Sequence, residues 1–358
     1  MADVFHEMIV KSWESQTNGS GDHTILYLSG PPATCKTEMT STSVEGVLGH
    51  FMDKFILANF MPVDMGGLWV PDHEKGRLRQ YNTDYFLGDI PGAEGSEYTC
   101  IFIDEMSNAS PDTQTSLLTT IESRQHNGRK VPDNVWFVAA GNRPEDGTGS
   151  NRLIKSLESR LTVIDYDDDY INGPLKRSWL EWASDGGNIH PIIRTFLEYK
   201  DERGFFYDFD PKRTTFGWPS PRTWTKFSRW LDLAPSKEAE LAWAKANLGE
   251  DVYREYQCFI DVGMNCPRPA DIIDDPAGTE VPIKADCAYA TLANLAAYLK
   301  DRDFLSTHVV DSAITYLRRF DDSFSVFGFR MMAKSHKDFS DTSSEYAKFL
   351  VDHQYLSI

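Results

Sequence analysis

Five short apolar runs divide the first part of the chain, and in none of them do apolar and polar residues alternate. The runs are residues 25–28, 55–57, 100–103, 135–140 and 161–164. Continuous apolar runs of this length are typical of strands buried on both faces, as in a parallel sheet. Helical patterns lie between the runs. Together they predict an α/β domain in which a five-stranded parallel sheet lies between helices.

One helix start is marked clearly. Ser110, Pro111 and Asp112 supply an N-cap, a first-turn proline and a first-turn acid. Apolar residues then follow at helical spacing, namely Leu117, Leu118 and Ile121. Leu153, Ile154 and Leu157 repeat that spacing farther along the chain. Both segments are predicted to be helices that pack on the sheet.

The strand pattern fades after about residue 170, and helical patterns replace it. They cover residues 179–182, 191–197, 224–233, 288–299 and 309–320. Between them, residues 267–282 are rich in proline, aspartate and glycine, which predicts a loop or linker. We therefore expect three regions: an α/β domain over 1–166, a helical lid over 167–265 and a C-terminal helical extension over 266–358.

A turn rich in glycine and proline follows the first apolar run. It consists of Gly30, Pro31, Pro32, Ala33, Thr34, Cys35, Lys36 and Thr37. Apart from Cys35 it matches the P-loop pattern, in which backbone N–H groups surround phosphate oxygens at a helix N-terminus. Lys36 would reach the β- and γ-phosphates of ATP, and the Thr37 hydroxyl would bind Mg²⁺. A strand–turn–helix that contains Lys-Thr by chance is the alternative.

Cys35 stands where the P-loop pattern has glycine. That position is often at positive φ, where a residue other than glycine costs roughly 1 kcal/mol, so the affinity for nucleotide is in question. A thiol beside a lysine and a helix N-terminus can also have a depressed pKa and be sensitive to oxidation. A tolerated substitution is the simpler interpretation.

Polar residues also follow the third and fourth apolar runs. They are Asp104 and Glu105 after the third, and Asn142 after the fourth. Ligands of open α/β sheets bind beyond the carboxyl ends of the strands, where Lys36 is also expected. Asp104 would hold Mg²⁺ through water and Glu105 would polarise the attacking water, while Asn142 would contact the γ-phosphate or the attacking water. A strand cap of two acids and an ordinary turn asparagine are the alternatives.

Two of these segments carry a more specific likeness. Residues 104–118 resemble the Walker B strand and following helix of MoxR-like AAA+ ATPases, and residues 138–144 are similar to their sensor 1 strand. Residues 64–72 also resemble a segment found in one subgroup, and the likeness covers roughly 24–235. It implies an AAA+ module that hydrolyses ATP with Mg²⁺ and couples hydrolysis to conformational work.

The resemblance also implies roles for two arginines. Arg160 falls where the family has an arginine before the fifth strand, although Leu161 replaces the usual phenylalanine. It would be the finger that reaches the γ-phosphate of a neighbouring subunit, with Arg152 as the fallback and a surface salt bridge as the alternative. Arg222 resembles the start of the sensor 2 helix and would contact phosphate in cis. A finger supplied in trans ties hydrolysis to assembly, so a homo-oligomeric ring, a hexamer, is expected.

Residues 125–132 contain a hairpin signal in Asn127 and Gly128. The family places a hairpin here that faces the ring channel, and Arg129 and Lys130 make a small basic spot. The segment is either a substrate contact or a plain surface hairpin. Members of the family often act beside a von Willebrand factor A-domain protein, so the resemblance implies such a partner and a chaperone-like role.

Charge narrows the choice of partners. The chain has 36 basic and 54 acidic residues, a formal net charge of −18, which disfavours binding to a phosphate backbone. Pore lysines in a ring could still supply a basic surface, so a nucleic-acid motor or helicase loader remains an alternative. A second alternative is an ATP-binding scaffold with little turnover, which Cys35 makes conceivable. The acidic run at 165–169 reads as a solvated strand exit rather than a metal site.

Cysteine and histidine patterns add no further site. The five cysteines form no C-x-x-C pair, and the histidines form no H-E-x-x-H or similar grouping. The first residues show no basic segment followed by an apolar one, and no run approaches 18 apolar residues. We therefore expect a cytoplasmic protein with no membrane partner. The cofactors that we expect remain those of the P-loop and the carboxylates, ATP and Mg²⁺.

Overall fold

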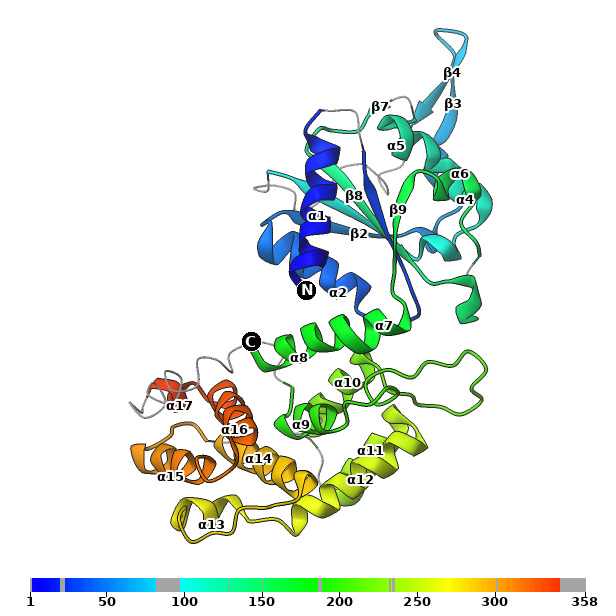
Figure 1. Cartoon of the computed structure of the whole chain (residues 1–358). Helices are drawn as coiled ribbons and strands as arrows, with labels where there is room; N and C mark the ends of the chain where they lie inside the picture. The colour runs from blue at the N-terminus through cyan, green and yellow to red at the C-terminus, as the bar shows by residue number, and fades with distance from the viewer. Residues whose placement is uncertain are drawn as a thin grey trace. The chain divides into compact units, whose positions relative to one another are not determined.

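The computed structural model describes residues 2–19, 23–81, 97–127, 129–149, 151–185, 189–231, 233, 236–300 and 302–341. The chain divides into two compact units, Met1–Leu175 with Asp210–Arg213, and Lys176–Phe209 with Thr214–Ile358. The first is an α/β unit and the second is helical (Figure 1). Apart from residues 167–175 and 210–213, the expected lid lies in the second unit together with the expected extension, so the boundaries at 166 and 265 stay predictions. Residues 342–358 of the expected extension lie outside the described residues.

A five-stranded parallel sheet organises the α/β unit. Its strands in spatial order are β2 (Phe51–Ile56), β5 (Thr99–Asp104), β8 (Val135–Gly141), β1 (Ile25–Ser29) and β9 (Leu161–Asp165). All neighbouring strands pair in parallel, and β5 and β8 are buried along their whole length. This burial explains their continuous apolar sequence. The predicted fold class is confirmed: a five-stranded parallel sheet between helices, followed by a helical region.

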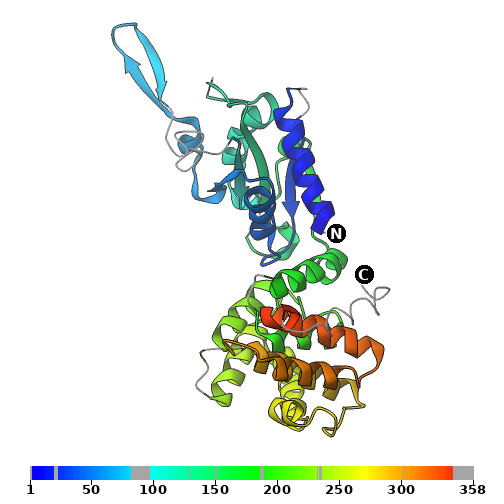
Figure 2. The same ribbon diagram turned by 90° about the vertical axis from the view of Figure 1, so that its left-hand side faces the viewer.

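Helices flank the sheet from different sides (Figures 1 and 2). They are α1 (Ala2–Thr17), α2 (Lys36–Ser41), α3 (Pro62–Gly66), α4 (Pro111–Ser116), α5 (Leu118–Ser123), α6 (Lys155–Glu158) and α7 (Asp168–Tyr170). The Gln16 amide of α1 donates to the Phe137 carbonyl at 2.9 Å and accepts from the Phe137 N–H at 2.8 Å. Leu117 and Ile121 pack against inward-facing strand residues. The predicted N-cap is present, because the Ser110 hydroxyl accepts from the Thr113 N–H at 3.2 Å.

Two small hairpins extend from the α/β unit. Strands β3 (Leu68–Asp72) and β4 (Arg77–Tyr81) pair antiparallel and stand away from the rest of the unit (Figure 2). Strands β6 (Gln125–His126) and β7 (Arg129–Lys130) form the hairpin that the sequence predicted. Its turn residue Asn127 has φ +49°. Gly128, the other residue of the predicted turn, lies outside the described residues.

All secondary-structure elements assigned among the described residues of the second unit are helices, joined by loops. They are α8 (Lys176–Asp185), α9 (Pro191–Tyr199), α10 (Pro221–Leu231), α11 (Lys237–Leu248), α12 (Glu250–Met264), α13 (Pro269–Asp274), α14 (Ala285–Lys300), α15 (Thr307–Leu317), α16 (Asp322–Ser335) and α17 (Lys337–Asp341). The prediction of a loop over 267–282 was wrong for α13. Pro269 starts that helix, and Ile272 and Ile273 pack into an apolar core with residues of α14 and α15.

No helix in the described part of the chain is long and apolar enough to span a bilayer.

Candidate nucleotide site

The turn between β1 and α2 is the centre of the candidate site. A Cβ at Gly30 would lie 2.4 Å from the Tyr166 Cβ, so only glycine fits there. Ala33 and Cys35 have φ of +62° and +59°, in the left-handed region that favours glycine. The expectation of a positive φ at Cys35 is thus confirmed. Left-handed residues in a tight turn are a feature of the backbone nests that bind anions.

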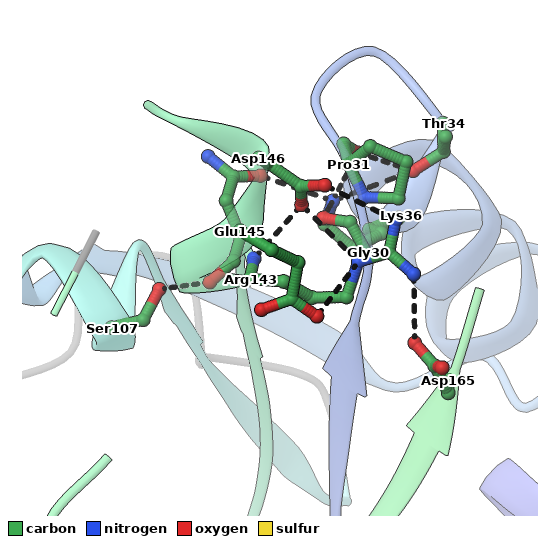
Figure 3. Close-up of polar contacts among 10 residues, drawn as sticks. Gly30, Pro31, Thr34, Lys36, Ser107, Arg143, Glu145, Asp146 and Asp165 are labelled. Carbon is green, nitrogen blue, oxygen red and sulfur yellow. Dashed lines mark hydrogen bonds and ion pairs between the residues drawn. The ribbon is translucent and has the colours of Figure 1, made fainter. Parts of the chain in front are cut away.

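Lys36 lies inside this turn (Figure 3). Its ammonium donates to the carbonyls of Gly30 and Pro31, both at 2.9 Å, and to the Thr34 hydroxyl at 3.4 Å. Lys36 is 9% exposed. Burial lowers the pKa of Lys36 to about 8, although the negative charges of nearby carboxylates oppose this shift. The charged form of a buried lysine is stabilised when an anion binds beside it.

Thr37 and Asp104, the expected metal ligands, are in direct contact. The Thr37 hydroxyl donates to Asp104 Oδ2 at 3.2 Å. Lys54 of β2 reaches the same oxygen, with its Nζ 2.8 Å from Asp104 Oδ2. A hydroxyl and a carboxylate are hard oxygen donors of the kind that Mg²⁺ prefers, and the lysine ammonium shows that a cation is accommodated beside them. The donor set therefore fits Mg²⁺.

Lys54 is a site residue that the sequence reasoning missed. It lies within a strand, and no local motif distinguishes it from other surface lysines. Its contact with Asp104 depends on the pairing of β2 with β5, which aligns Ile56 with Asp104. Only knowledge of that strand pairing could have found it.

Asn142 lies at the end of β8, next to Lys36. Its side-chain oxygen accepts from Lys36 Nζ at 3.3 Å, and its backbone carbonyl accepts from the Ser107 hydroxyl at 2.8 Å. The preceding Gly141 is packed closely, since a Cβ there would lie 2.4 Å from the Tyr27 hydroxyl. The structure therefore brings together Lys36 and Asn142, which lie far apart in the sequence.

Glu105 follows Asp104 in a left-handed conformation, with φ +55°. Its carboxylate accepts a hydrogen bond from the Asn108 side-chain amide, and its N–H donates to Asp104 Oδ1 at 2.9 Å. The turn after β5 thus orients both carboxylates. The sequence reasoning also missed Asn108, although its spacing of three residues from Glu105 was visible.

Arg143 adds a second cation near Lys36 (Figure 3). Its guanidinium binds the Asp146 carboxylate through NH2 at 3.1 Å and Nε at 3.3 Å, and NH1 lies 3.5 Å from Asp165 Oδ1. Its positive charge is one of the influences that lower the pKa of Lys36. The sequence reasoning gave Arg143 no role. In the structure its guanidinium reaches from the end of β8 to Asp165, the last residue of β9, at the carboxyl edge of the sheet, where the parallel strands end.

Arg160 lies at the opposite end of the strands from the P-loop. We call this end, where the parallel strands begin, the amino edge of the sheet. It directly precedes β9, whereas the P-loop follows β1, and these two strands are parallel neighbours. A five-residue strand, about 16 Å long, therefore separates them. Arg160 NH2 pairs with Glu122 at 2.8 Å, and NH1 donates to the Ser156 carbonyl. The side chain cannot reach the P-loop of its own chain.

Arg152 and Arg222 are both exposed. Arg152 precedes α6 in the α/β unit, and Arg222 is the second residue of α10 in the second unit. Their proposed contacts with phosphate stay predictions.

Among the described residues, no group of three or more His, Cys, Asp or Glu side chains could hold a metal ion. The acidic run after β9 is exposed apart from Tyr166, and Asp167 caps α7 by accepting from the Tyr170 N–H at 2.7 Å. This agrees with a solvated strand exit.

Comparisons with known proteins add little to this geometry. No protein-family model and no curated protein sequence matches the chain. Among solved structures it is similar to a provisionally named ATPase from Cytophaga hutchinsonii, at 12% identity over 97% of this chain and 87% of the other, with a TM-score of 0.32. It is also similar to NtrX from Brucella abortus, at 12% identity over 93% and 68% of the two chains, with a TM-score of 0.35. TM-scores this low carry no argument, so the function is inferred from the site.

Proposed function

We propose that this protein is a Mg²⁺-dependent ATPase of the AAA+ class, from its MoxR-like branch. The observation that carries the proposal is the meeting of Lys36, Thr37, Asp104 and Asn142 at one edge of the sheet. Lys36 and Thr37 belong to the P-loop, Asp104 ends β5, and Asn142 follows β8. Together they supply a cation for phosphate, oxygen ligands for Mg²⁺ and an amide for the γ-phosphate. Phosphoryl transfer depends mainly on positioning and charge stabilisation, which this set supplies.

Each side chain has a task in hydrolysis. Lys36 would stabilise the β- and γ-phosphates, and Thr37 and Asp104 would hold Mg²⁺. Glu105 would leave Asn108 and orient the attacking water in line with the γ-phosphate. Asn142 would contact the γ-phosphate, which links the state of the nucleotide to the end of β8.

A ring that remodels a protein partner is the second part of the proposal. Arg160 supports it. An arginine at the amino edge is too far from the P-loop of its own chain, so a γ-phosphate within its reach would have to be bound to another subunit. The resemblance to MoxR-like proteins supports a hexamer that acts beside a von Willebrand factor A-domain protein. Arg222 would contact phosphate in cis.

An ATP-binding scaffold with little turnover is the rival that one observation favours. The Glu105 carboxylate is engaged by Asn108, and in this arrangement it is not aimed at a water molecule beside a phosphate. A scaffold would bind nucleotide with the same Lys36 and Thr37 and keep Glu105 in this position.

Steady-state ATPase activity, measured against protein concentration, tests the proposal. Glu105→Gln keeps the size of the side chain and removes the base, so we expect a loss of at least about 100-fold. Glu158→Gln is the matched control on α6 and should retain activity. Wild-type activity that rises cooperatively with concentration supports a ring. A wild type that binds ATP tightly and turns over no faster than Glu105→Gln would favour the scaffold.

A further inference from the structure

Lys54 and Asp104 project from the same face of the sheet. In the register of β2 and β5, Lys54 is paired with Phe102 and Ile56 is paired with Asp104. Paired residues, and residues two apart in a strand, point to the same side. The Lys54 side chain therefore extends along β5 toward its carboxyl end, where its ammonium lies 2.8 Å from Asp104 Oδ2.

The two oxygens of Asp104 have different partners. Oδ1 accepts from the Glu105 N–H at 2.9 Å. Oδ2 receives the Thr37 hydroxyl at 3.2 Å and also faces the Lys54 ammonium. The Lys54 ammonium therefore lies next to the position where Thr37 and Asp104 would bind a metal ion.

Burial differs sharply between the two partners of this ion pair. The Asp104 side chain is 13% exposed, whereas that of Lys54 is 41% exposed. A carboxylate this buried needs a compensating positive charge. A lysine with a flexible, half-exposed stem can withdraw into water at small cost. The pair is therefore suited to exchange one cation for another.

We propose that Lys54 is an internal counter-ion of Asp104 that competes with Mg²⁺. The inference rests on the proposed function, because it takes Thr37 and Asp104 as the metal ligands. In the nucleotide-free protein the Lys54 ammonium neutralises the buried carboxylate. When the metal binds, Lys54 leaves Oδ2 for solvent, because two cations at one oxygen repel each other. The empty site consequently has a low affinity for metal.

Mn²⁺ binding, followed by the electron paramagnetic resonance signal of the free ion, tests the proposal with and without ADP. Lys54→Met removes the competing charge and keeps the length of the side chain. We expect its Mn²⁺ dissociation constant to fall about tenfold, which corresponds to about 1.4 kcal/mol. Lys54→Arg keeps a cation at this position and should stay close to the wild type.

Lys155→Met is the matched control. Lys155 forms an ion pair of the same length, with its Nζ 2.8 Å from Glu158 Oε2 on α6, at the amino edge of the sheet. Its loss changes the net charge by the same amount as the loss of Lys54. Mn²⁺ affinity should stay within about twofold of the wild type, because surface charges this far apart are screened by salt.

Three results would overturn the role of Lys54. They are an unchanged or weaker Mn²⁺ affinity in Lys54→Met, an equal gain in Lys155→Met, and no Mn²⁺ binding in any variant. The proposed function is judged separately, by binding of a fluorescent ADP in EDTA and by hydrolysis. Normal ADP binding, together with the same Mn²⁺ affinity in the wild type and in Lys54→Met, would overturn the counter-ion proposal and leave the proposal of nucleotide binding unaffected.

Discussion

The carboxyl edge and the amino edge of the parallel sheet differ in how deeply their polar residues are buried. At the carboxyl edge, Lys36, Asp104 and Asn142 are buried, with 9% of each whole residue exposed, and they bind one another or their own loops. At the amino edge, the Arg160 side chain is 32% exposed and its partner Glu122 is 57% exposed. Buried polar groups hold their geometry, because each lost contact leaves a desolvated atom. Exposed ion pairs contribute about 1 kcal/mol or less and exchange readily.

In the function that we propose, this difference in burial separates two tasks within one unit. The polar side chains of the carboxyl edge are already held in place by one another, which suits the nucleotide binding that we propose for it. The amino edge presents an arginine that can leave Glu122 for a stronger anion. Such an arginine is suited to act on another molecule.

The largest expected effect comes from the amino edge. Arg160→Ala should lower kcat about 1,000-fold, the range of an arginine finger, and leave ADP affinity unchanged. Steady-state ATPase assays and a fluorescent ADP titration measure the two quantities. Activity that survives the substitution would mean that Arg160 is not the finger, and Arg152→Ala would then be tested.

Mixtures of two inactive variants make this test sharper. Arg160→Ala has an intact P-loop, and Lys36→Ala has an intact Arg160. If the finger acts in trans, mixing them should restore part of the activity, because some sites combine the two intact halves. Mixtures with no more activity than the separate proteins would contradict a shared site.

A smaller loss is expected at Asn142. Removal of one preorganised polar contact to a transition state costs about 100-fold in kcat, so Asn142→Ala should fall by that amount and retain ADP binding. Single-turnover hydrolysis measures the chemical step directly. Ser107→Ala, which removes the hydrogen bond to the Asn142 carbonyl and the one shared with the Tyr27 hydroxyl but leaves the Asn142 side chain in place, serves as the control and should lose less.

The pKa of Lys36 predicts a pH dependence at the carboxyl edge. Burial lowers this pKa to about 8, and a bound phosphate favours the charged lysine. Above that pH, ADP binding requires the uptake of one proton, so the dissociation constant should rise about tenfold per pH unit. Below it the constant should be flat, since the phosphates of ADP, with a pKa of about 6, are already ionised near neutral pH. Titrations with fluorescent ADP in EDTA measure it.

The same lysine affects folding stability in the nucleotide-free state. Its pKa is lower in the folded chain than in the unfolded chain, so between about pH 8 and pH 10.5 the unfolded chain binds more protons. Stability should therefore rise with pH through this window, and Lys36→Met should abolish that rise. Denaturant unfolding without nucleotide checks the sign. A slope that is the same in Lys36→Met would contradict the assignment to this lysine.

The smallest expected effect is at Cys35. Its φ of +59° favours glycine, so Cys35→Gly should be more stable than Cys35→Ala by about 1 kcal/mol. Cys35→Ala is the control because it keeps the Cβ and removes the thiol. Denaturant unfolding measures the difference, and an alanine variant as stable as the glycine variant would show that the loop relaxes around a side chain.

Much of the α/β unit could be predicted from the sequence. The five apolar runs lie in strands or overlap them. In β1, β5 and β8, which are buried, apolar residues stand at nearly every position, whereas the edge strands β2 and β9 are only partly buried and carry polar residues as well. Ser110 and Pro111 marked the start of α4, and Gly30 to Thr37 marked the turn after β1. In each case the information is local.

The α13 helix shows where local patterns fail. Its apolar residues Ile272 and Ile273 are adjacent and too few to display a helical period among the prolines, aspartates and glycines around them. Their burial against α14 and α15 stabilises the helix, and that contact joins residues far apart in the sequence. Lys54 escaped notice for a similar reason, since only the register of β2 against β5 gives it a partner.

By itself the sequence determined the chemistry and the local conformations: an apolar strand, a P-loop with a cysteine at a left-handed position, two carboxylates after β5 and an asparagine after β8. Tertiary structure decided which of these side chains meet. Parallel pairing placed Lys36, Thr37, Asp104 and Asn142 at one edge and Arg160 at the other, and it brought Lys54 to Asp104. Such distances are set by strand order and register, because hydrogen bonds between strands join segments that no local pattern connects.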